Sequence, residues 1–477
     1  MVAASPRTRT IARTRPARGA ALLAAALAVA IDGTAPAAQG QDRAVEPVKL
    51  ITLDPGHFHA ALIQKEMYPG VSDVVHVYAP VGTDLVAHVN RVAQFNERAE
   101  RPTRWQLEVH SSPDFFERML RERPGNVVIL SGRNRPKIDR VLASVNAGLH
   151  VLADKPWIVS SDDLPKLDAA LAAAAKKGLV AYDVMTERFE ITTILQRVFV
   201  ADTAVTGQLV PGTEDEPGVI LESVHYLMKT VAGVPNLRPT WFFDTEQQGE
   251  GLSDVGTHLV DLVPWILFPG RVINYRTDIR LLAAERWPTM MSAADFKRVT
   301  GGSGFPASLA PQVKDGQLRY DGNTSLLYTL RGIHTRVKAT WDFEAAAGAG
   351  DTHYAAVRGT RSRIEVRQGP EQKYRTELYI VPLSPADHAR VAEAAKARVA
   401  SLQSTVRGLA IEDTGRELHV IVPDAYRTGH EAHFAEVTRE FLGYVRNPKS
   451  MPAWEQSAML AKYYVTTGGV ALSRKGK

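Results

Sequence analysis

One stretch decides the fold of the N-terminal half, and it reads Gly148-Leu149-His150-Val151-Leu152-Ala153-Asp154-Lys155-Pro156. Its apolar run is typical of a buried strand, and the proline after it ends strand pairing. Similar runs lie on both sides of it, and helical patterns separate them. The predicted strands are residues 48–53, 74–78, 106–109, 127–130, 150–153 and 179–182. Strands that alternate with helices predict a Rossmann-like, doubly wound parallel sheet over residues 42–185.

The pattern changes after residue 185, where extended segments follow one another with alternating polarity. They lie at residues 219–224, 272–277, 325–329, 335–342, 353–359, 363–367, 376–381 and 418–422. Turn residues separate them, and closing helices are predicted at residues 434–444 and 458–471. This pattern predicts a large, mostly antiparallel sheet with helices on one face. Residues 186–477 are therefore expected to form an α+β domain for substrate binding or oligomerisation.

A second stretch carries chemistry in the C-terminal half, and it reads Gly251-Leu252-Ser253-Asp254-Val255-Gly256-Thr257-His258-Leu259-Val260-Asp261. The apolar residues after it recur at helical spacing. Asp254, His258 and Asp261 would share one face of that helix. A carboxylate and an imidazole on one face can hold a sugar hydroxyl and move its proton. A metal site, or a plain helix start with a buried histidine, would also fit this spacing.

The first 41 residues differ from the rest of the chain. Arginines between Arg7 and Arg18 precede an uncharged run of 12 residues, Ala20–Ile31, and the small-residue site Ala35-Pro36-Ala37 follows. This order is typical of a secretory signal peptide, and the run is too short to span a membrane. An arginine-rich presequence of the mitochondrial type is the alternative. We therefore expect an exported protein, periplasmic or secreted, with no membrane partner.

Charge and cysteine content exclude several classes of function. The chain of 477 residues has a formal net charge of +5, but residues 1–41 hold five arginines and one aspartate. Most of the positive charge therefore belongs to the predicted signal, and the nearly neutral remainder gives no reason to expect nucleic-acid binding. The sequence has no cysteine, which excludes disulfides, thiol nucleophiles and thiolate metal ligands.

The two stretches together resemble the Gfo/Idh/MocA family of sugar and polyol dehydrogenases. That family pairs a strand ending in acid-Lys-Pro, here Asp154-Lys155-Pro156, with a second domain that carries Asp-x-Gly-x-His-x-x-Asp, here residues 254–261. The resemblance covers nearly the whole chain after the signal. It implies an NAD(P)-dependent oxidoreductase acting on a secondary hydroxyl of a sugar or glycoside, with NAD or NADP as cofactor. Tight binding of that cofactor would suit an exported enzyme.

The resemblance also implies roles for individual residues. Lys155 matches the family lysine that lies between nicotinamide and substrate, and Asp254 and His258 match the acid and the histidine on the substrate side. An imidazole can accept the hydroxyl proton, and a nearby lysine can stabilise the developing alkoxide. We therefore expect these three residues to be catalytic. The expected cofactor contacts are Gly56, His57, His59, Ser131, Asn134, Asp154, Lys155 and Pro156.

The phosphate-binding turn departs from the family pattern. Gly-x-Gly-x-x-Gly is replaced by Asp54-Pro55-Gly56-His57-Phe58-His59, where a helix is predicted over residues 57–65 with Asp54 as its cap. The Asp54 carboxylate would repel a pyrophosphate. Three explanations stay open: His57 and His59 donate to a cofactor in a modified pose, the site has lost NAD, or the two histidines bind metal. We expect no metal, because rings two positions apart lie on different faces of a helix.

Polar and aromatic residues near the presumed cleft are expected to bind the substrate. They are Arg188, Glu222, His225, Lys229 and Trp241. Charged groups hold sugar hydroxyls, and an aromatic face stacks on the sugar ring. The expected partner is thus a small carbohydrate, and the family resemblance raises homo-oligomerisation through the antiparallel sheet. Two other functions stay open: a glycoside-cleaving or rearranging enzyme with a recycled cofactor, and a non-catalytic carbohydrate-binding protein.

Overall fold

The computed structural model describes residues 47–231, 234–235 and 237–475. The predicted signal peptide, residues 1–41, lies outside the described residues, so its role stays a prediction. Within the described ranges, no helix combines the length and the apolar character that crossing a bilayer requires.

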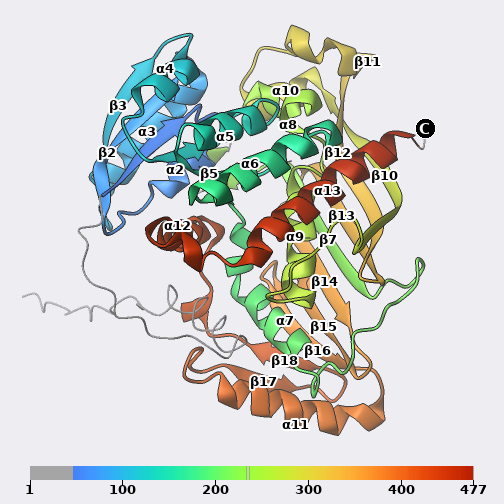
Figure 1. The fold of residues 1–477 in the computed structure, drawn as a ribbon. Helices are drawn as coiled ribbons and strands as arrows, with labels where there is room; N and C mark the ends of the chain where they lie inside the picture. Colours follow the sequence, from blue (N-terminus) through green and yellow to red (C-terminus); the bar gives the residue numbers. More distant parts are fainter. Residues whose placement is uncertain (1–46, 232–233, 236, 476–477) are drawn as a thin grey trace, which may run out of the picture.

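The N-terminal unit is a parallel sheet with helices on both faces (Figure 1). Each face of the sheet carries an apolar core. Its strand order is β3-β2-β1-β4-β5-β6. The strands are β1 (Val48–Leu53), β2 (Val71–Ala79), β3 (Gln106–Ser111), β4 (Val127–Leu130), β5 (His150–Ala153) and β6 (Ala181–Asp183). The helices are α2 (His59–Ile63), α3 (Thr83–Glu97), α4 (Phe115–Glu122), α5 (Lys137–Asn146) and α6 (Leu164–Lys177). The order reverses between β1 and β4, where doubly wound sheets bind ligands. The predicted Rossmann-like fold is confirmed.

The C-terminal unit is the predicted large sheet, in the order β10-β12-β13-β7-β14-β15-β16-β18-β17, with β11 paired to β12. The pair β13–β7 runs parallel and the other pairs run antiparallel. The strands are β7 (Val219–Met228), β10 (Ile279–Ser292), β11 (Val313–Lys314), β12 (Gln317–Leu330), β13 (Ile333–Glu344), β14 (Thr352–Arg358), β15 (Ser362–Gln368), β16 (Glu377–Pro382), β17 (Ala410–Asp413) and β18 (Leu418–Ile421). The helices are α7 (Ile191–Ala201), α8 (Thr245–Gln248), α9 (Val255–Leu267), α10 (Ala293–Thr300) and α11 (Pro385–Ser401), and β8 (Thr230–Val231) pairs with β9 (Val234–Pro235).

The strand predicted at residues 272–277 is wrong, and the long strand β10 is not predicted from the sequence. Residues 272–277 form a turn, because the Asn274 carbonyl accepts hydrogen bonds from the amides of Thr277 and Asp278. The strand begins after this turn, as β10. Pro288 interrupts the apolar alternation of β10 in the sequence. The structure accommodates this proline because β10 is an edge strand whose register shifts between residues 287 and 289.

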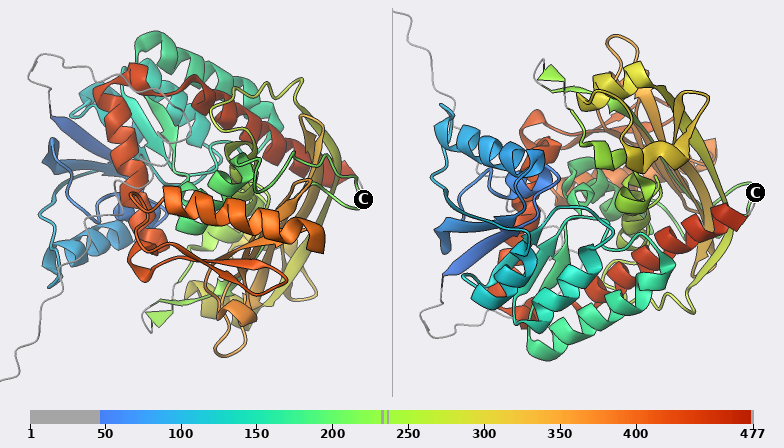
Figure 2. Two further views of the ribbon diagram at one scale, coloured as in Figure 1. Left: turned by 90° about the horizontal axis from the view of Figure 1, so that it is seen from below. Right: turned by 90° about the horizontal axis from the view of Figure 1, so that it is seen from above.

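The last two described helices return to the parallel sheet. α12 (His430–Arg446) places Phe434 and Phe441 in the core that β1 and α2 form, and α13 (Ala453–Lys475) places Met459 and Tyr463 in the core on the other face. α13 also packs along α9 and β10. Figure 2 shows this helix, in red, between the helices of the parallel sheet and the large sheet. The two units therefore share helices that come late in the sequence.

A network of buried charges joins the two units. Arg188, in the short helix η2 (Thr186–Phe189), donates to Asp261 of α9 at 2.6 and 2.7 Å and to Glu455 of α13 at 2.9 and 3.1 Å. Lys462 of α13 lies 2.9 Å from Asp261 and 2.6 Å from Asp183 at the end of β6. Burial opposes the ionisation of Asp261, but Arg188 and Lys462 outweigh it and hold its pKa below the usual range. Mutual pairing thus offsets the cost of burying these charges.

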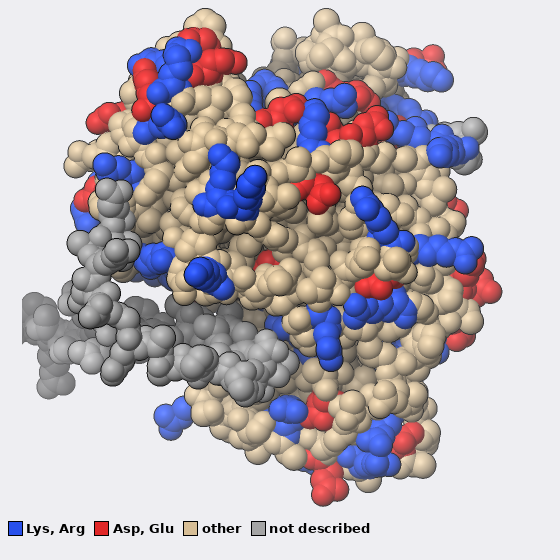
Figure 3. All heavy atoms as spheres, in the orientation of Figure 1, with Lys and Arg blue, Asp and Glu red and all other residues tan. Residues whose placement is uncertain are grey.

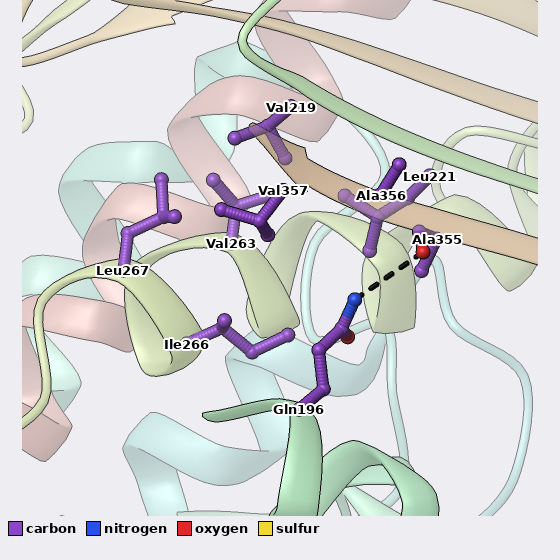
Figure 4. Close-up of a pocket in the computed structure, with 9 residues that line it drawn as sticks. All are labelled: Gln196, Val219, Leu221, Val263, Ile266, Leu267, Ala355, Ala356 and Val357. Atoms are coloured by element: carbon purple, nitrogen blue, oxygen red, sulfur yellow. Dashed lines mark hydrogen bonds between the residues drawn. The ribbon is translucent and has the colours of Figure 1, made fainter. Parts of the chain in front are cut away.

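The helix-covered face of the large sheet is a tightly packed apolar core. Figure 4 shows one point of it, where Val263 and Ile266 of α9 approach Val219 of β7. Gln196 of α7 donates its side-chain amide to the Ala355 carbonyl at 3.3 Å. The void between these residues has no room for a water molecule. This region is core packing, and the candidate site lies elsewhere.

The surface shown in Figure 3 carries basic and acidic side chains interspersed with each other. Lys166, for example, pairs with Asp139 and Asp163 on the outside of α6. Such exposed pairs contribute little to stability, because water and salt screen them.

The buried network predicts that Lys462→Met is strongly destabilising. The substitution keeps an apolar side chain but leaves Asp183 and Asp261 short of a partner, which costs about 3–5 kcal/mol for a buried pair. Denaturant unfolding measures the loss. Lys166→Met, at an exposed pair, is the matched control and should change the free energy of unfolding little. Equal losses in the two variants would contradict a structural role for the network.

Candidate active site

The centre of the site is an ion pair between the two units. Lys155 follows β5, and its Nζ donates to Asp254 Oδ1 at 2.6 Å and to the Asp254 carbonyl at 3.1 Å. Asp254 is the N-cap residue of α9 but makes no capping hydrogen bond with its side chain. Its Oδ2 is buried with no hydrogen-bond partner among the described residues. Burial opposes the ionisation of Asp254, but Lys155 outweighs it and holds the pKa of this carboxyl below its usual range.

His258 lies one helical turn beyond Asp254. Its Nδ1 is buried and has no hydrogen-bond partner in the part of the chain that the structure describes. Burial lowers the pKa of His258 well below its ordinary value, and the charge of Lys155 lowers it further. The imidazole is therefore neutral at pH 7 and can accept a proton. Asp261, two turns from Asp254, is occupied by Arg188 and Lys462 in the buried network.

Asp154 gathers two histidines beside this pair. His57 Nδ1 and His59 Nδ1 lie 2.9 and 3.0 Å from the same oxygen, Asp154 Oδ2, and the two rings are 3.9 Å apart at their centroids. The expectation that these rings would diverge is wrong. α2 begins only at His59, so His57 belongs to the turn and its ring can reach the same carboxylate. Burial lowers the pKa of His59 to about 3, so it stays neutral at pH 7.

In the turn after β1, the charge of Asp54 is neutralised by a neighbouring arginine. Asp54 does not cap the helix; it adopts a left-handed conformation with φ 47°. Its carboxylate pairs with Arg140, which neutralises the charge expected to repel a phosphate. A Cβ at Gly132 would lie 2.4 Å from the Asp54 carbonyl oxygen, so a glycine is needed there for close packing. The Gly56 and His57 amides bond to the carbonyls of Asp54 and Ser131, so phosphate recognition would need other donors.

A cavity of about 640 Å³ lies between the two units beside this turn. Its lining includes Gly56, His88, Arg91, Arg133 and Trp241. The volume is typical of a small-molecule site. His88 is 4 % exposed, and neither of its ring nitrogens has a hydrogen-bond partner among the described residues. The unpaired imidazole and the two arginines fit a ligand that carries hydrogen-bonding groups and phosphates, as a dinucleotide does.

Three of the expected substrate residues pair with aspartates. Trp241 lines the cavity, and its indole N–H donates to Asp84 at 3.1 Å. His225 Nδ1 and Lys229 Nζ lie 2.9 and 2.5 Å from Asp351 Oδ2. The charge of Lys229 helps lower the pKa of His430, as does that of Lys155. Lys229 is therefore within electrostatic range of His430.

Two expected substrate residues do not reach the cleft. Arg188 is 5 % exposed, and its guanidinium is occupied by Asp261 and Glu455. Glu222 lies on β7 between Leu221 and Ser223, which face the helix-covered core. Because successive side chains of a strand point to opposite faces, Glu222 lies on the other side of the sheet. The structure thus corrects both expectations.

The remaining expected cofactor residues, Ser131, Asn134 and Pro156, are buried beside the histidine cluster and Lys155. Ser131 Oγ donates to Asp154 at 3.2 Å, so it supports the histidine cluster. Asn134 donates to the Gln248 carbonyl at 2.8 Å and accepts from Lys137, so it joins the two units. Pro156 follows Lys155 directly and is buried. Ser131 and Asn134 therefore already have protein partners, and only Ser131 contacts Asp154.

Several residues at the site escape sequence reasoning. Glu187 is one: burial and Glu190 raise its pKa to about 7, and Lys155 partly offsets this. Its place after the last parallel strand is the only signal that could have found it. Arg238 is another, with its guanidinium 4.6 Å from the centroid of the Trp341 ring. Asp351 is the third, and no local pattern around it or Arg238 indicates a site.

Comparison with known proteins identifies the family. A family model described as "Putative oxidoreductase C terminal domain" matches residues 195–474. The crystal structure of "a putative oxidoreductase" from Parabacteroides merdae ATCC 43184 is 42 % identical in sequence, with a TM-score of 0.89. The match covers 92 % of this chain and 100 % of that chain. The chain belongs to this oxidoreductase family. Its expected relation to Gfo/Idh/MocA oxidoreductases with a C-terminal domain is confirmed.

More distant structures share the fold of this oxidoreductase. A levoglucosan dehydrogenase in complex with NADH and levoglucosan is 14 % identical, with a TM-score of 0.53 over 90 % of this chain and 98 % of that chain. A 3-ketoreductase from Actinomadura kijaniata in complex with NADP is also 14 % identical, with a TM-score of 0.52 over 88 % and 98 %. At this identity the likeness shows the fold alone. No curated protein sequence matches the chain.

His88 predicts an acid-sensitive free energy of unfolding. Burial, together with Arg91, lowers the pKa of His88 from 6.5 to about 4. A histidine with a lowered folded-state pKa contributes stability above its unfolded pKa, and that contribution is lost as the pH falls toward the folded value. Between pH 6.5 and about 4, the free energy of unfolding should therefore fall less in His88→Gln than in the wild type, by up to roughly 3 kcal/mol.

Urea unfolding at several pH values in that window measures this difference. His334→Gln, on β13 away from the cavity, is the control and should follow the wild type. The same pH dependence in His88→Gln and the wild type would contradict the assignment of His88 as a buried neutral imidazole.

Proposed function

We propose that this oxidoreductase is an exported, NAD(P)-dependent enzyme that oxidises a secondary hydroxyl of a sugar or glycoside, or reduces the matching ketone. One observation carries the proposal: Asp254 Oδ2 and His258 Nδ1 are both buried without partners among the described residues, one turn apart and next to Lys155. Buried polar atoms are normally hydrogen-bonded. A substrate hydroxyl would satisfy both.

The side chains divide the chemistry between them. His258 is neutral because burial and Lys155 disfavour its charged form. As the neutral imidazole one turn from Asp254, it would take the hydroxyl proton. Lys155, fixed by Asp254 at 2.6 Å, would stabilise negative charge on the reacting oxygen. Asp254 would orient Lys155 and hold the hydroxyl through its second oxygen. His225 and Lys229 would bind other hydroxyls, and their shared partner Asp351 holds them in place.

The cavity beside the turn would hold the cofactor. Its arginines, Arg91 and Arg133, would hold the phosphates in place of the turn amides that protein carbonyls occupy. When bound, the nicotinamide supplies a hydride acceptor or donor at the ends of the parallel strands. The distant relatives in complex with NADH and NADP support this choice of cofactor, and levoglucosan in one of them supports a carbohydrate substrate. Because free nicotinamide nucleotide is scarce outside the cytoplasm, an exported enzyme would need to hold it tightly.

Substitution of the central residues should remove catalysis, and circular dichroism checks that each variant is folded. Lys155→Ala and His258→Ala should each lower kcat/KM by at least about 100-fold, because each removes a group that acts on the moving proton or the charged oxygen. Turnover of a panel of sugars and glycosides, followed by nucleotide absorbance, measures the effect. Lys166→Ala and His334→Ala are matched controls outside the cleft. Near wild-type rates in both Lys155→Ala and His258→Ala would contradict the assignment of these two residues as catalytic.

The cofactor itself is tested on protein purified without added nucleotide. After denaturation, the supernatant should contain close to one NAD(H) or NADP(H) per chain. If no nucleotide is released and none binds when added, the dehydrogenase proposal fails. Product formation without net reduction of the nucleotide would instead identify a glycoside-rearranging enzyme with a recycled cofactor.

A further inference from the structure

The cluster of His57, His59 and Asp154 has the composition of a metal site. Each residue offers one ligand atom, and these atoms all lie within 4.8 Å of one another. Asp154 Oδ2 is 2.9 Å from His57 Nδ1 and 3.0 Å from His59 Nδ1. In a tetrahedral site with bonds of about 2.0–2.1 Å, neighbouring ligand atoms are about 3.3 Å apart. Small shifts of the two rings would therefore suffice to admit an ion.

We propose that His57, His59 and Asp154 bind a divalent transition-metal ion of the zinc class at the edge of the substrate cleft. Two imidazoles and a carboxylate are a donor set that zinc, cobalt and nickel prefer, while magnesium and calcium prefer oxygen alone. The sequence offers no thiolate that would compete for such an ion. The site borders the nucleotide cavity through His57, and the ligand assigned to the ion below rests on the proposed function.

The surroundings of the cluster favour an open, reactive site over a closed structural one. His59 is 8 % exposed, whereas the His57 side chain is 24 % exposed, so one side of the cluster remains accessible. His430, at the start of α12, lies with its ring centroid 5.9 Å from that of His59. It is close enough to become a further ligand by a side-chain rotation, or to hold a bound water. Ser131 donates to Asp154 at 3.2 Å and orients the carboxylate, as outer partners of metal ligands do.

The position of the cluster indicates what the ion would bind. Asp154 directly precedes Lys155, whose Nζ is bonded to Asp254. An ion held by Asp154 would thus lie one residue along the chain from the lysine that is proposed to stabilise the reacting oxygen. Its open position would take a hydroxyl or carbonyl oxygen of the carbohydrate and polarise it. The chemical class of ligand is therefore a sugar with an oxygen next to the reacting carbon.

A second cluster provides an internal comparison. His76, Glu108 and His110 also bring three ligand atoms within 4.8 Å, on β2 and β3 at the far edge of the parallel sheet. Arg118 lies 3.3 Å from His110 Nδ1, and its positive charge opposes a cation there. The Glu108 side chain is 57 % exposed. We therefore expect the ion at Asp154 and not at this edge.

The test uses cobalt(II) as the probe on purified protein that has been treated with chelator and dialysed. Wild type and the double variant H76Q/H110Q should each bind one cobalt ion per chain, with visible absorption bands of a tetrahedral or five-coordinate ion, and zinc should displace it. H57Q/H59Q should bind at least roughly 100-fold more weakly and lack the bands. Circular dichroism and thermal unfolding check the fold of each variant.

H57Q/H59Q removes buried groups and could fail to fold. In that case the single variant His57→Asn, at the more exposed of the two histidines, provides the test. The proposal fails if wild type binds no cobalt. It also fails if the bands survive in H57Q/H59Q or His57→Asn, or if H76Q/H110Q loses them instead. Equal binding of magnesium and cobalt would likewise overturn it, since the histidines would then not be ligands.

Discussion

The position of α9 relative to the parallel sheet is the constraint on which the site depends. Asp261 near the middle of that helix is held by Arg188 and Lys462, which belong to segments that pack on the parallel sheet. Seven residues earlier, the same helix presents Asp254 to Lys155 at 2.6 Å. A rotation of the helix would break both contacts together. The buried charges therefore act as an alignment device, and their cost of desolvation is offset by a fixed register between the two halves of the site.

The turn after β1 shows how a fold can keep a geometry after losing the residues that usually produce it. A left-handed residue is still present, but it is Asp54 instead of glycine. The glycine requirement moves to Gly132, on which Asp54 packs, and the added negative charge is paired with Arg140. The bulk of His59 is accommodated because its ring turns toward Asp154. The two substitutions, Asp54 and His59, look damaging one by one but are thus mutually consistent.

Sequence reasoning predicts the features that depend on local pattern. The strand before Lys155 and the helical spacing of Asp254 and His258 are short-range signals, and the structure places them as expected. The sequence does not predict the role of a side chain whose ion-pair partner is distant in the chain, or the face of a strand on which a side chain lies. From the sequence, Arg188 is expected to bind a ligand, but in the structure it pairs with Asp261 and Glu455, which are distant in the chain. Glu222 is misplaced because a strand gives no indication of which face is inward, and the ring directions of His57 and His59 depend on a helix start two residues later than expected.

The shared helices have a consequence for how the protein is made. α12 and α13 complete the two cores of the parallel sheet, yet they are translated after the entire second unit. Synthesis proceeds at about 5–20 residues per second, so the nascent sheet would wait on the order of tens of seconds for its last helices. During that time its apolar faces and the charges of Asp183 and Arg188 lack their final partners. The two cores of the parallel sheet can therefore be completed only after the distal segments have emerged from the ribosome.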